Sequence, residues 1–433
     1  MLTKTPNTNL TDDIWLEIFL LLPLNSIFKL RCVSKVWSSL LSNPNFINKW
    51  IQFNSSNESL PWIVFHSYNT VYSKNNFLIS YAKSLNSKSI SGNEHGFSFR
   101  FLNPNPHDQS IYLLDSSNGL VLCTPSYYRP RIYYVCNPLT QKWVSLPPSP
   151  TSTTSWVVNG FTCESISSTS CYKVVRIPKF EGSSNKFSIE IFSSDLGEWI
   201  IREVTCPASV IWHYSHVRKS IVIVNGVLYW TELGNRILTY SLKNNSETGD
   251  RQSRLINFPD MELEDSYGDN SSYCLGQLGF LCYARIMTSQ KILSVWVLED
   301  EWHLLHKDID LSDLVAEMYS KFHVCEFEDP EREDEDFMEV QVLGFSPVDK
   351  NVILLSYHIF VWAFNIKTRR HEELSQTSFL GNTHSAYRYQ LFNTHSVDRY
   401  RVYYPFALKP MPTILPPPSW AGTLANVNVS NLQ

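Results

Sequence analysis

The sequence predicts a two-part chain in which a small all-helical module is followed by a large all-β domain. Residues 10–50 contain no glycine and place apolar side chains at helical spacing, whereas the remainder consists of short β-branched and aromatic runs separated by Gly, Ser and Asn. With 433 residues, of which 43% are hydrophobic and 18% charged, the chain is long enough for more than one domain and too apolar to be disordered over most of its length.

The first helix is expected to end at Pro23, and Asp12 and Asp13 place negative charge in its first turn, where the helix dipole favours it. Between residues 14 and 22 every side chain except Glu17 is apolar, so the apolar surface runs nearly around the helix. A module of this size is too small to cover such a helix on all sides, which predicts that a partner protein covers the rest. The alternative is that the helix packs into the β domain of its own chain.

A second helical pattern runs from Leu24 to Leu41 and is broken at residues 42–44, before a last short helix that contains Phe46 and Trp50. The module is therefore expected to be an all-α unit of three helices.

Short strand-like runs recur in the large domain. In each unit a strand turns through a polar hairpin into another strand that begins near an anchor residue, and these anchors are Trp143, Trp199, Trp302 and His371. Their spacing suits four-stranded units of roughly 40 to 50 residues, which predicts a β-propeller of about five to seven blades. Because the spacings are unequal, a large irregular β-sandwich is the alternative.

The expected boundaries are a flexible leader at 1–9, the helical module at 10–53, a Ser/Asn-rich linker at 54–59, the propeller at 60–408 and a Pro-rich tail at 409–433. Within the propeller, residues 326–339 hold nine acidic side chains and Arg332, a net charge of −8. Such a tract is interpreted as a solvated insertion between blades, and a docking loop for a basic partner is the alternative.

Charge and composition exclude several classes of partner. A net charge of −5 leaves no basic excess for binding nucleic acid or an anionic membrane. The apolar stretch at 14–24 is shorter than the roughly 18 to 20 residues that span a bilayer. The leader lacks a hydrophobic signal core and the nine cysteines form no Cys-x-x-Cys pair, so we expect reduced thiols in the cytosol or nucleus.

No motif for catalysis is recognisable. There is no phosphate-binding loop, no Gly-x-Gly-x-x-Gly and no Gly-x-Ser-x-Gly. His213-x-x-His216 and His303-x-x-His306 have a spacing that a helix could turn into metal ligands, but both lie in strand-like or turn segments without a third ligand. We therefore expect a non-catalytic protein without a cofactor or a metal.

Residues 10–46 resemble an F-box. The matching elements are Asp12-Asp13, Glu17-Ile18, Leu22-Pro23, Arg31-Cys32-Val33-Ser34-Lys35-Val36-Trp37 and Pro44-Asn45-Phe46. Thr11 stands where the family usually has Pro, and Thr is also a good helix cap. The later part of the chain resembles the F-box-associated, kelch-like propeller domain of plant F-box proteins, through residues 117–121, 136–140, Trp143 and Leu146-Pro147. Neither the Gly-Gly pair of kelch repeats nor a Trp-Asp dipeptide occurs.

The resemblance implies a substrate-recognition subunit of a Skp–cullin–F-box E3 ubiquitin ligase. The F-box would bind the Skp-type adaptor, and through it the cullin and the RING subunit, while the propeller would bind an unknown target protein. The adaptor-binding residues that the resemblance implies are Leu10, Ile14, Ile18, Leu22, Pro23, Leu24, Val33, Lys35 and Trp37.

Target binding is assigned to exposed aromatic side chains of the propeller, with Tyr127, Tyr128 and Trp212 as candidates. The alternative function is a propeller that binds a small molecule or a sugar, or a non-ligase scaffold, with the helical module as a docking piece.

Overall fold

The computed structural model describes most of the helical module and the strands of the β domain. The described residues are 11–22, 24–43, 45–46, 49–50, 53, 62–68, 79–83, 102, 111–126, 129–138, 140–151, 156–166, 169–212, 221–232, 236–242, 253–260, 271–277, 280–287, 289–325, 340–347, 349, 351–357, 360–374, 401–407 and 415. The leader at 1–9, the linker at 54–59, the acidic tract at 326–339 and all of the Pro-rich tail except Leu415 lie outside them.

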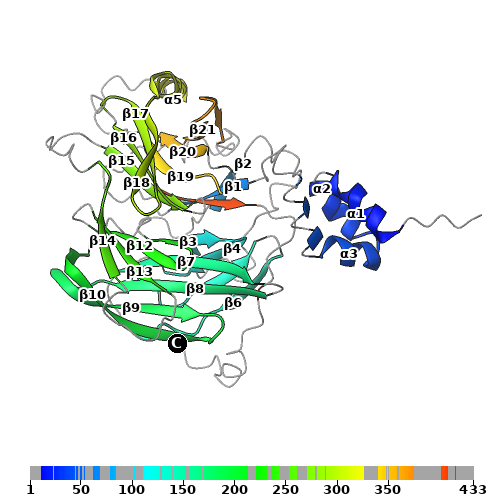
Figure 1. Ribbon diagram of the computed structural model, residues 1–433, viewed down its shortest axis with the longest axis horizontal. Helices are drawn as coiled ribbons and strands as arrows, with labels where there is room; N and C mark the ends of the chain where they lie inside the picture. Colours follow the sequence, from blue (N-terminus) through cyan, green and yellow to red (C-terminus); the bar gives the residue numbers. More distant parts are fainter. Residues whose placement is uncertain are drawn as a thin grey trace, which may run out of the picture.

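Three helices of the module are described with their bounds, and Figure 1 shows them in blue to one side of the strands; residues 45–46, 49–50 and 53 are helical as well, where a last short helix was predicted. The three helices are α1 (Asp12–Leu20), α2 (Leu24–Arg31) and α3 (Lys35–Leu41). The pattern expected at 24–41 is thus divided into two helices. Ser34 accounts for the division, because it has extended backbone and its Oγ accepts a hydrogen bond from the Trp37 N–H at 3.1 Å, as an N-cap does.

The module encloses a core of its own. Trp15 and Phe19 of α1 contact Trp37 of α3, with ring centroids 5.1 and 5.3 Å from that of Trp37. The Trp50 indole donates a hydrogen bond to the Leu22 carbonyl at 3.0 Å, which ties the end of the module to the end of α1. The buried side chains of this core are Phe19, Leu20, Ile27, Leu41, Phe46 and Trp50. All of them belong to the module, so within the described part of the chain the buried face of α1 packs against its neighbouring helices.

Five four-stranded antiparallel sheets follow along the chain. The first is β3 (Tyr112–Ser117), β4 (Leu120–Thr124), β5 (Tyr134–Asn137) and β6 (Lys142–Ser145); the second is β7 (Val157–Ile166), β8 (Thr169–Pro178), β9 (Ser183–Ser193) and β10 (Glu198–Ile211); the third is β11 (Ile221–Val224), β12 (Val227–Glu232), β13 (Arg236–Ser241) and β14 (Ser253–Asn257); the fourth is β15 (Ser271–Gln277), β16 (Leu281–Met287), β17 (Ile292–Leu298) and β18 (Trp302–Asp310); the fifth is β19 (Gln341–Phe345), β20 (Val352–Tyr357), β21 (Phe360–Asn365) and β22 (His371–Glu373).

A sixth sheet closes the ring and joins distant parts of the chain. It contains β2 (Ile79–Lys83), β1 (Trp62–Tyr68) and β23 (Arg401–Ala407), and Figure 1 shows the red-orange β23 beside the blue β1. The first strands of the five four-stranded sheets contact one another in sequence, from β3 through β7, β11 and β15 to β19, and β23 contacts both β19 and β3. This closed circle confirms the predicted β-propeller, with five four-stranded blades and a composite sheet between the last and the first.

The repeated units share their turns. Asn118-Gly119 and Asn225-Gly226 join the first two strands of their sheets with positive φ angles, as Asn-Gly hairpins require. The third and fourth strands of three sheets are joined by a turn in which the N–H of residue i+4 donates to the carbonyl of residue i, and these residue pairs are 137 and 141, 193 and 197, and 365 and 369. The anchors Trp143, Trp199, Trp302 and His371 all lie at the start of the outermost strand of a blade.

Two glycines let the first strands of neighbouring blades approach closely. A Cβ at Gly160 of β7 would lie 2.4 Å from Ile221 Cγ2 of β11, and one at Gly276 of β15 would lie 2.2 Å from Phe345 Cδ2 of β19. Real Cβ atoms do not come so close to other heavy atoms. These positions therefore need glycine for packing between blades rather than for backbone conformation.

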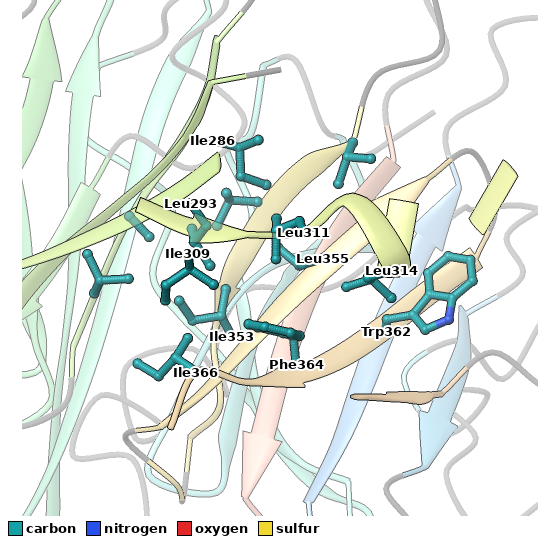
Figure 2. Packing of buried hydrophobic residues seen from close by; sticks show 14 of the residues in the cluster. Ile286, Leu293, Ile309, Leu311, Leu314, Ile353, Leu355, Trp362, Phe364 and Ile366 are labelled. Carbon is teal, nitrogen blue, oxygen red and sulfur yellow. The ribbon is translucent and has the colours of Figure 1, made fainter. Parts of the chain in front are cut away.

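One helix of the β domain was not expected. α5 (Ser312–Cys325) follows β18 and lies over the fifth blade, where Leu314 packs near Trp362 (Figure 2). Its buried side chains Leu314, Val315 and Met318 are spaced as on one face of a helix. On its other side, Glu317 contacts His371 of β22 at 2.7 Å.

Candidate functional site

The first helix divides its apolar side chains between two faces. Phe19 and Leu20 are buried in the module, whereas Ile14, Ile18 and Leu21 are 45%, 38% and 69% exposed. These three residues follow one another at intervals of four and three, so they form a single stripe along the helix. We call Ile14, Ile18 and Leu21 the α1 stripe. The described part of the chain leaves more than a third of the surface of each of these residues uncovered.

A second exposed apolar group consists of Val33, in the turn between α2 and α3, and Val36, in the first turn of α3. Val33 and Val36 are 63% and 59% exposed, and Lys35 between them is exposed as well. Trp37 is half-buried because its ring packs on Trp15 and Phe19. The module thus leaves apolar side chains exposed on α1, on α3 and in the turn between α2 and α3, beside an aromatic core.

The predicted adaptor-binding residues differ in how exposed they are. Ile14, Ile18, Val33 and Lys35 are exposed, while Leu22 and Trp37 are half-buried in the module's own core. Leu24 is the first residue of α2. Leu10 and Pro23 lie outside the described residues.

Two exposed residues, Leu21 and Val36, were missed by the sequence reasoning. Leu21 could have been found, because it is three residues after Ile18 and seven after Ile14 and so continues their stripe. Val36 could not, because its exposure depends on how α3 packs on α1.

The prediction for Trp212 is wrong. Trp212 is 6% exposed and belongs to the core between the second and third blades, where its indole N–H donates to the Ile177 carbonyl at 3.2 Å. A side chain enclosed in this way cannot contact a target protein. Tyr127 and Tyr128 lie outside the described residues.

A buried polar network lies beneath the connection between β4 and β5. Arg176 of β8 and Glu190 of β9 form an ion pair, and both side chains are completely buried. The Arg176 guanidinium also donates to the Tyr133 hydroxyl at 2.7 Å and to the Pro130 carbonyl at 3.1 Å. Burial raises the pKa of the Tyr133 hydroxyl well above its ordinary value, so that hydroxyl stays protonated and donates to Asn159 Oδ1 at 2.8 Å. The network joins the first blade to the second.

In the described part of the chain, no group of three or more His, Cys, Asp or Glu side chains is arranged to hold a metal ion. His303 lies on β18, where it is exposed beside Glu299, and His213 and His216 lie outside the described residues. None of the described helices is long and apolar enough to cross a membrane.

Comparison with known proteins agrees with both parts of this architecture. A family model described as "F-box protein At3g26010-like, beta-propeller" matches residues 93–327, which is more than half of the chain. The chain belongs to this F-box propeller family. A model of the F-box domain matches residues 8–49 of this F-box protein, the segment that holds α1, α2 and α3.

Three Arabidopsis thaliana relatives illustrate the similarity. "F-box protein At3g26010" is 25% identical over 73% of this chain and 72% of its own length, and "F-box protein At5g03970" is 29% identical over 69% and 68%. "Putative F-box/kelch-repeat protein At4g22430" is 24% identical over 85% and 82%. An F-box followed by a propeller is the general architecture of substrate-recognition adaptors of Skp–cullin–F-box ligases, and such adaptors are typically non-catalytic.

Proposed function

We propose that this F-box protein is the substrate-recognition subunit of a Skp–cullin–F-box ubiquitin ligase and binds a Skp-type adaptor through the α1 stripe, Val33 and Val36. The observation that supports this most directly is the division of α1, whose one face completes the module's core while Ile14, Ile18 and Leu21 stay exposed. The adaptor would link the chain to the cullin and the RING subunit. The propeller would hold a target protein.

The size of the exposed surface fits this role. Full burial of an aliphatic side chain contributes about 1.5–3 kcal/mol, and association costs about 4–15 kcal/mol. The α1 stripe alone, already partly covered, would barely offset that cost. Adding Val33 and Val36 brings the gross gain to about 4–8 kcal/mol, within the range of that cost, so we expect both parts of the surface to contact the adaptor.

In this function the chain performs no chemical step of its own. By holding the target close to the ubiquitin-charged conjugating enzyme, it would raise the effective concentration of the target's lysines. We place this activity in the cytosol or nucleus. The thiols of Cys123 and Cys136, whose sulfur atoms lie 3.9 Å apart, form no disulfide, which supports a reducing compartment.

Co-purification with a Skp-type adaptor tests the proposal. The full chain should retain the adaptor, and Ile14→Asp with Ile18→Asp should abolish retention because two carboxylates would then lie in an apolar interface. Both positions are exposed, so the variant should keep its circular dichroism spectrum and its unfolding temperature. Leu22 is a poorer choice, because it packs in the module's core.

The matched control is Ile201→Asp with Leu304→Asp, which changes two exposed apolar residues on outer strands of the propeller in the same way. This control should retain the adaptor like the unaltered chain. If the α1 variant binds the adaptor as well as the control does, the α1 stripe is not the binding surface and the proposal is wrong.

A further inference from the structure

The connection between β4 and β5 presents two arginines to solvent. Arg129 and Arg131 are exposed and flank Pro130, which is buried. Because burial alternates along these three residues, both arginine side chains leave the chain on the same side, with their Cα atoms roughly 6–7 Å apart. In the described part of the chain, neither arginine takes part in a salt bridge.

The backbone of this segment is held at three successive carbonyl groups. A buried side chain, a backbone N–H and a buried hydroxyl each donate one hydrogen bond to it. These are Arg176 Nη2 to the Pro130 carbonyl at 3.1 Å, the Ser149 N–H to the Arg131 carbonyl at 3.2 Å, and Thr124 Oγ1 to the Ile132 carbonyl at 2.8 Å. The two arginines therefore project from a fixed backbone, which lowers the ordering cost of binding.

The buried ion pair beneath the segment fits a positioning role. A buried Arg–Glu pair contributes little net stability compared with apolar side chains of similar volume. Here the guanidinium of Arg176 reaches the carbonyl of Pro130, directly between Arg129 and Arg131, while Glu190 balances its charge. The network thus fixes the residue on which the spacing of the two exposed arginines depends.

Among the described residues, the surroundings add one exposed apolar side chain and one pair of opposite charges. Ile132 is 42% exposed and follows Arg131 directly. The connection between β8 and β9 lies at the same end of the neighbouring blade, since both connections join the second strand of a blade to the third, and it carries Lys179 and Glu181, which contact each other at 3.7 Å. These two charges cancel, so the charge of the two arginines remains.

We propose that residues 129–132 form a docking site for an extended acidic segment of a protein partner, with Arg129 and Arg131 binding carboxylates at alternate positions. In an extended segment, side chains two residues apart share one side and are spaced like the two arginines. The planar guanidinium binds a carboxylate through two parallel hydrogen bonds. That the bound protein is the ligase's target rests on the proposed function.

Fluorescence anisotropy with the full chain tests the site. The probe is a labelled twelve-residue peptide of alternating Glu and Ser, and its control is the peptide with Gln in place of Glu. The unaltered chain should bind the Glu peptide at least about fivefold more tightly than the Gln peptide at 50 mM salt, and the difference should shrink at 500 mM, because exposed charge pairs are screened. Arg129→Glu with Arg131→Glu should remove the preference.

The matched control is Lys142→Glu with Lys367→Glu, which makes the same change of charge at two exposed positions, the first residue of β6 and the turn before β22, at the opposite end of the propeller. It should keep the preference for the Glu peptide. Equal binding of the two peptides by the unaltered chain, or equal loss in the two charge-reversal variants, would overturn the site. Adaptor retention, measured on the same samples, reports separately on the proposed function, because the arginines lie far along the chain from the module.

Discussion

Replacing Glu190 by Gln should destabilise the propeller strongly. The change keeps the size and shape of the side chain, so it creates no cavity, but it removes the negative charge that faces Arg176. Both side chains are completely buried, so the Arg176 guanidinium cannot reach solvent and stay hydrated. Its remaining contacts, with the Tyr133 hydroxyl and the Pro130 carbonyl, are to neutral groups.

Removing one partner of a buried ion pair typically costs about 3–5 kcal/mol. A domain is commonly stable by about 5–15 kcal/mol, so the loss should be a large fraction of the propeller's free energy of unfolding. The double variant Arg176→Met with Glu190→Leu removes both charges and keeps most of the volume. It should unfold within about 2 kcal/mol of the unaltered chain, because no uncompensated charge remains.

Urea unfolding followed by tryptophan fluorescence measures both effects on the propeller. Glu190→Gln should shift the transition to markedly lower urea, and the double variant should restore most of it. The reasoning fails if Glu190→Gln changes the free energy of unfolding by less than about 1 kcal/mol, or if the double variant is as unstable as the single one.

Three further outcomes are expected. Gly160→Ala should lower the propeller's free energy of unfolding by about 1–3 kcal/mol, because the new methyl group would meet Ile221 at 2.4 Å, and a rise in stability would contradict that packing. Ser34→Ala should lower the helical module's stability by about 0.5–2 kcal/mol, seen as reduced helical circular dichroism on heating, through loss of the bond to Trp37 N–H. His371 beside Glu317 lowers the pKa of the Glu317 carboxyl below its ordinary 4.5. The contact between the two side chains therefore contributes stability above pH 4.5, and this contribution is lost as the pH falls through the lowered pKa of Glu317 in the folded protein. The unfolding temperatures of the unaltered chain and Glu317→Gln should therefore differ at pH 6 and converge at low pH; a constant difference would contradict this.

Local patterns were sufficient to predict much of the architecture. The helical module follows from residues that are close in sequence, since caps, apolar spacing and Pro23 act within one or two turns. The blade anchors Trp143, Trp199 and His371 were recognisable because the hairpins before them repeat the same short-range turn chemistry. The helix α5 was also recognisable in principle, because Leu314, Val315 and Met318 have helical spacing, but the expectation of strands throughout the domain concealed it.

The exposure of individual side chains could not be predicted in the same way. Trp212 and Trp143 are both aromatic residues of the β domain, yet Trp212 is buried between two blades and Trp143 is 42% exposed on an outer strand. Strand alternation shows which side chains share a face, but whether a neighbouring blade covers that face depends on the closed ring.

The two-part organisation, the repeated hairpins and the apolar first helix depend on contacts within a few residues, so the amino-acid order is enough to predict them. Three other features come from long-range packing: the α1 stripe stays exposed, β23 pairs with β1, and Arg176 meets Glu190 beneath Pro130. The last two arrangements join strands or blades, and the first depends on how α1 packs on α3. The physical reason is the same in each case: hydrophobic burial and ion pairing reward proximity in space, and the spacing of residues along one chain does not specify which distant surfaces will meet.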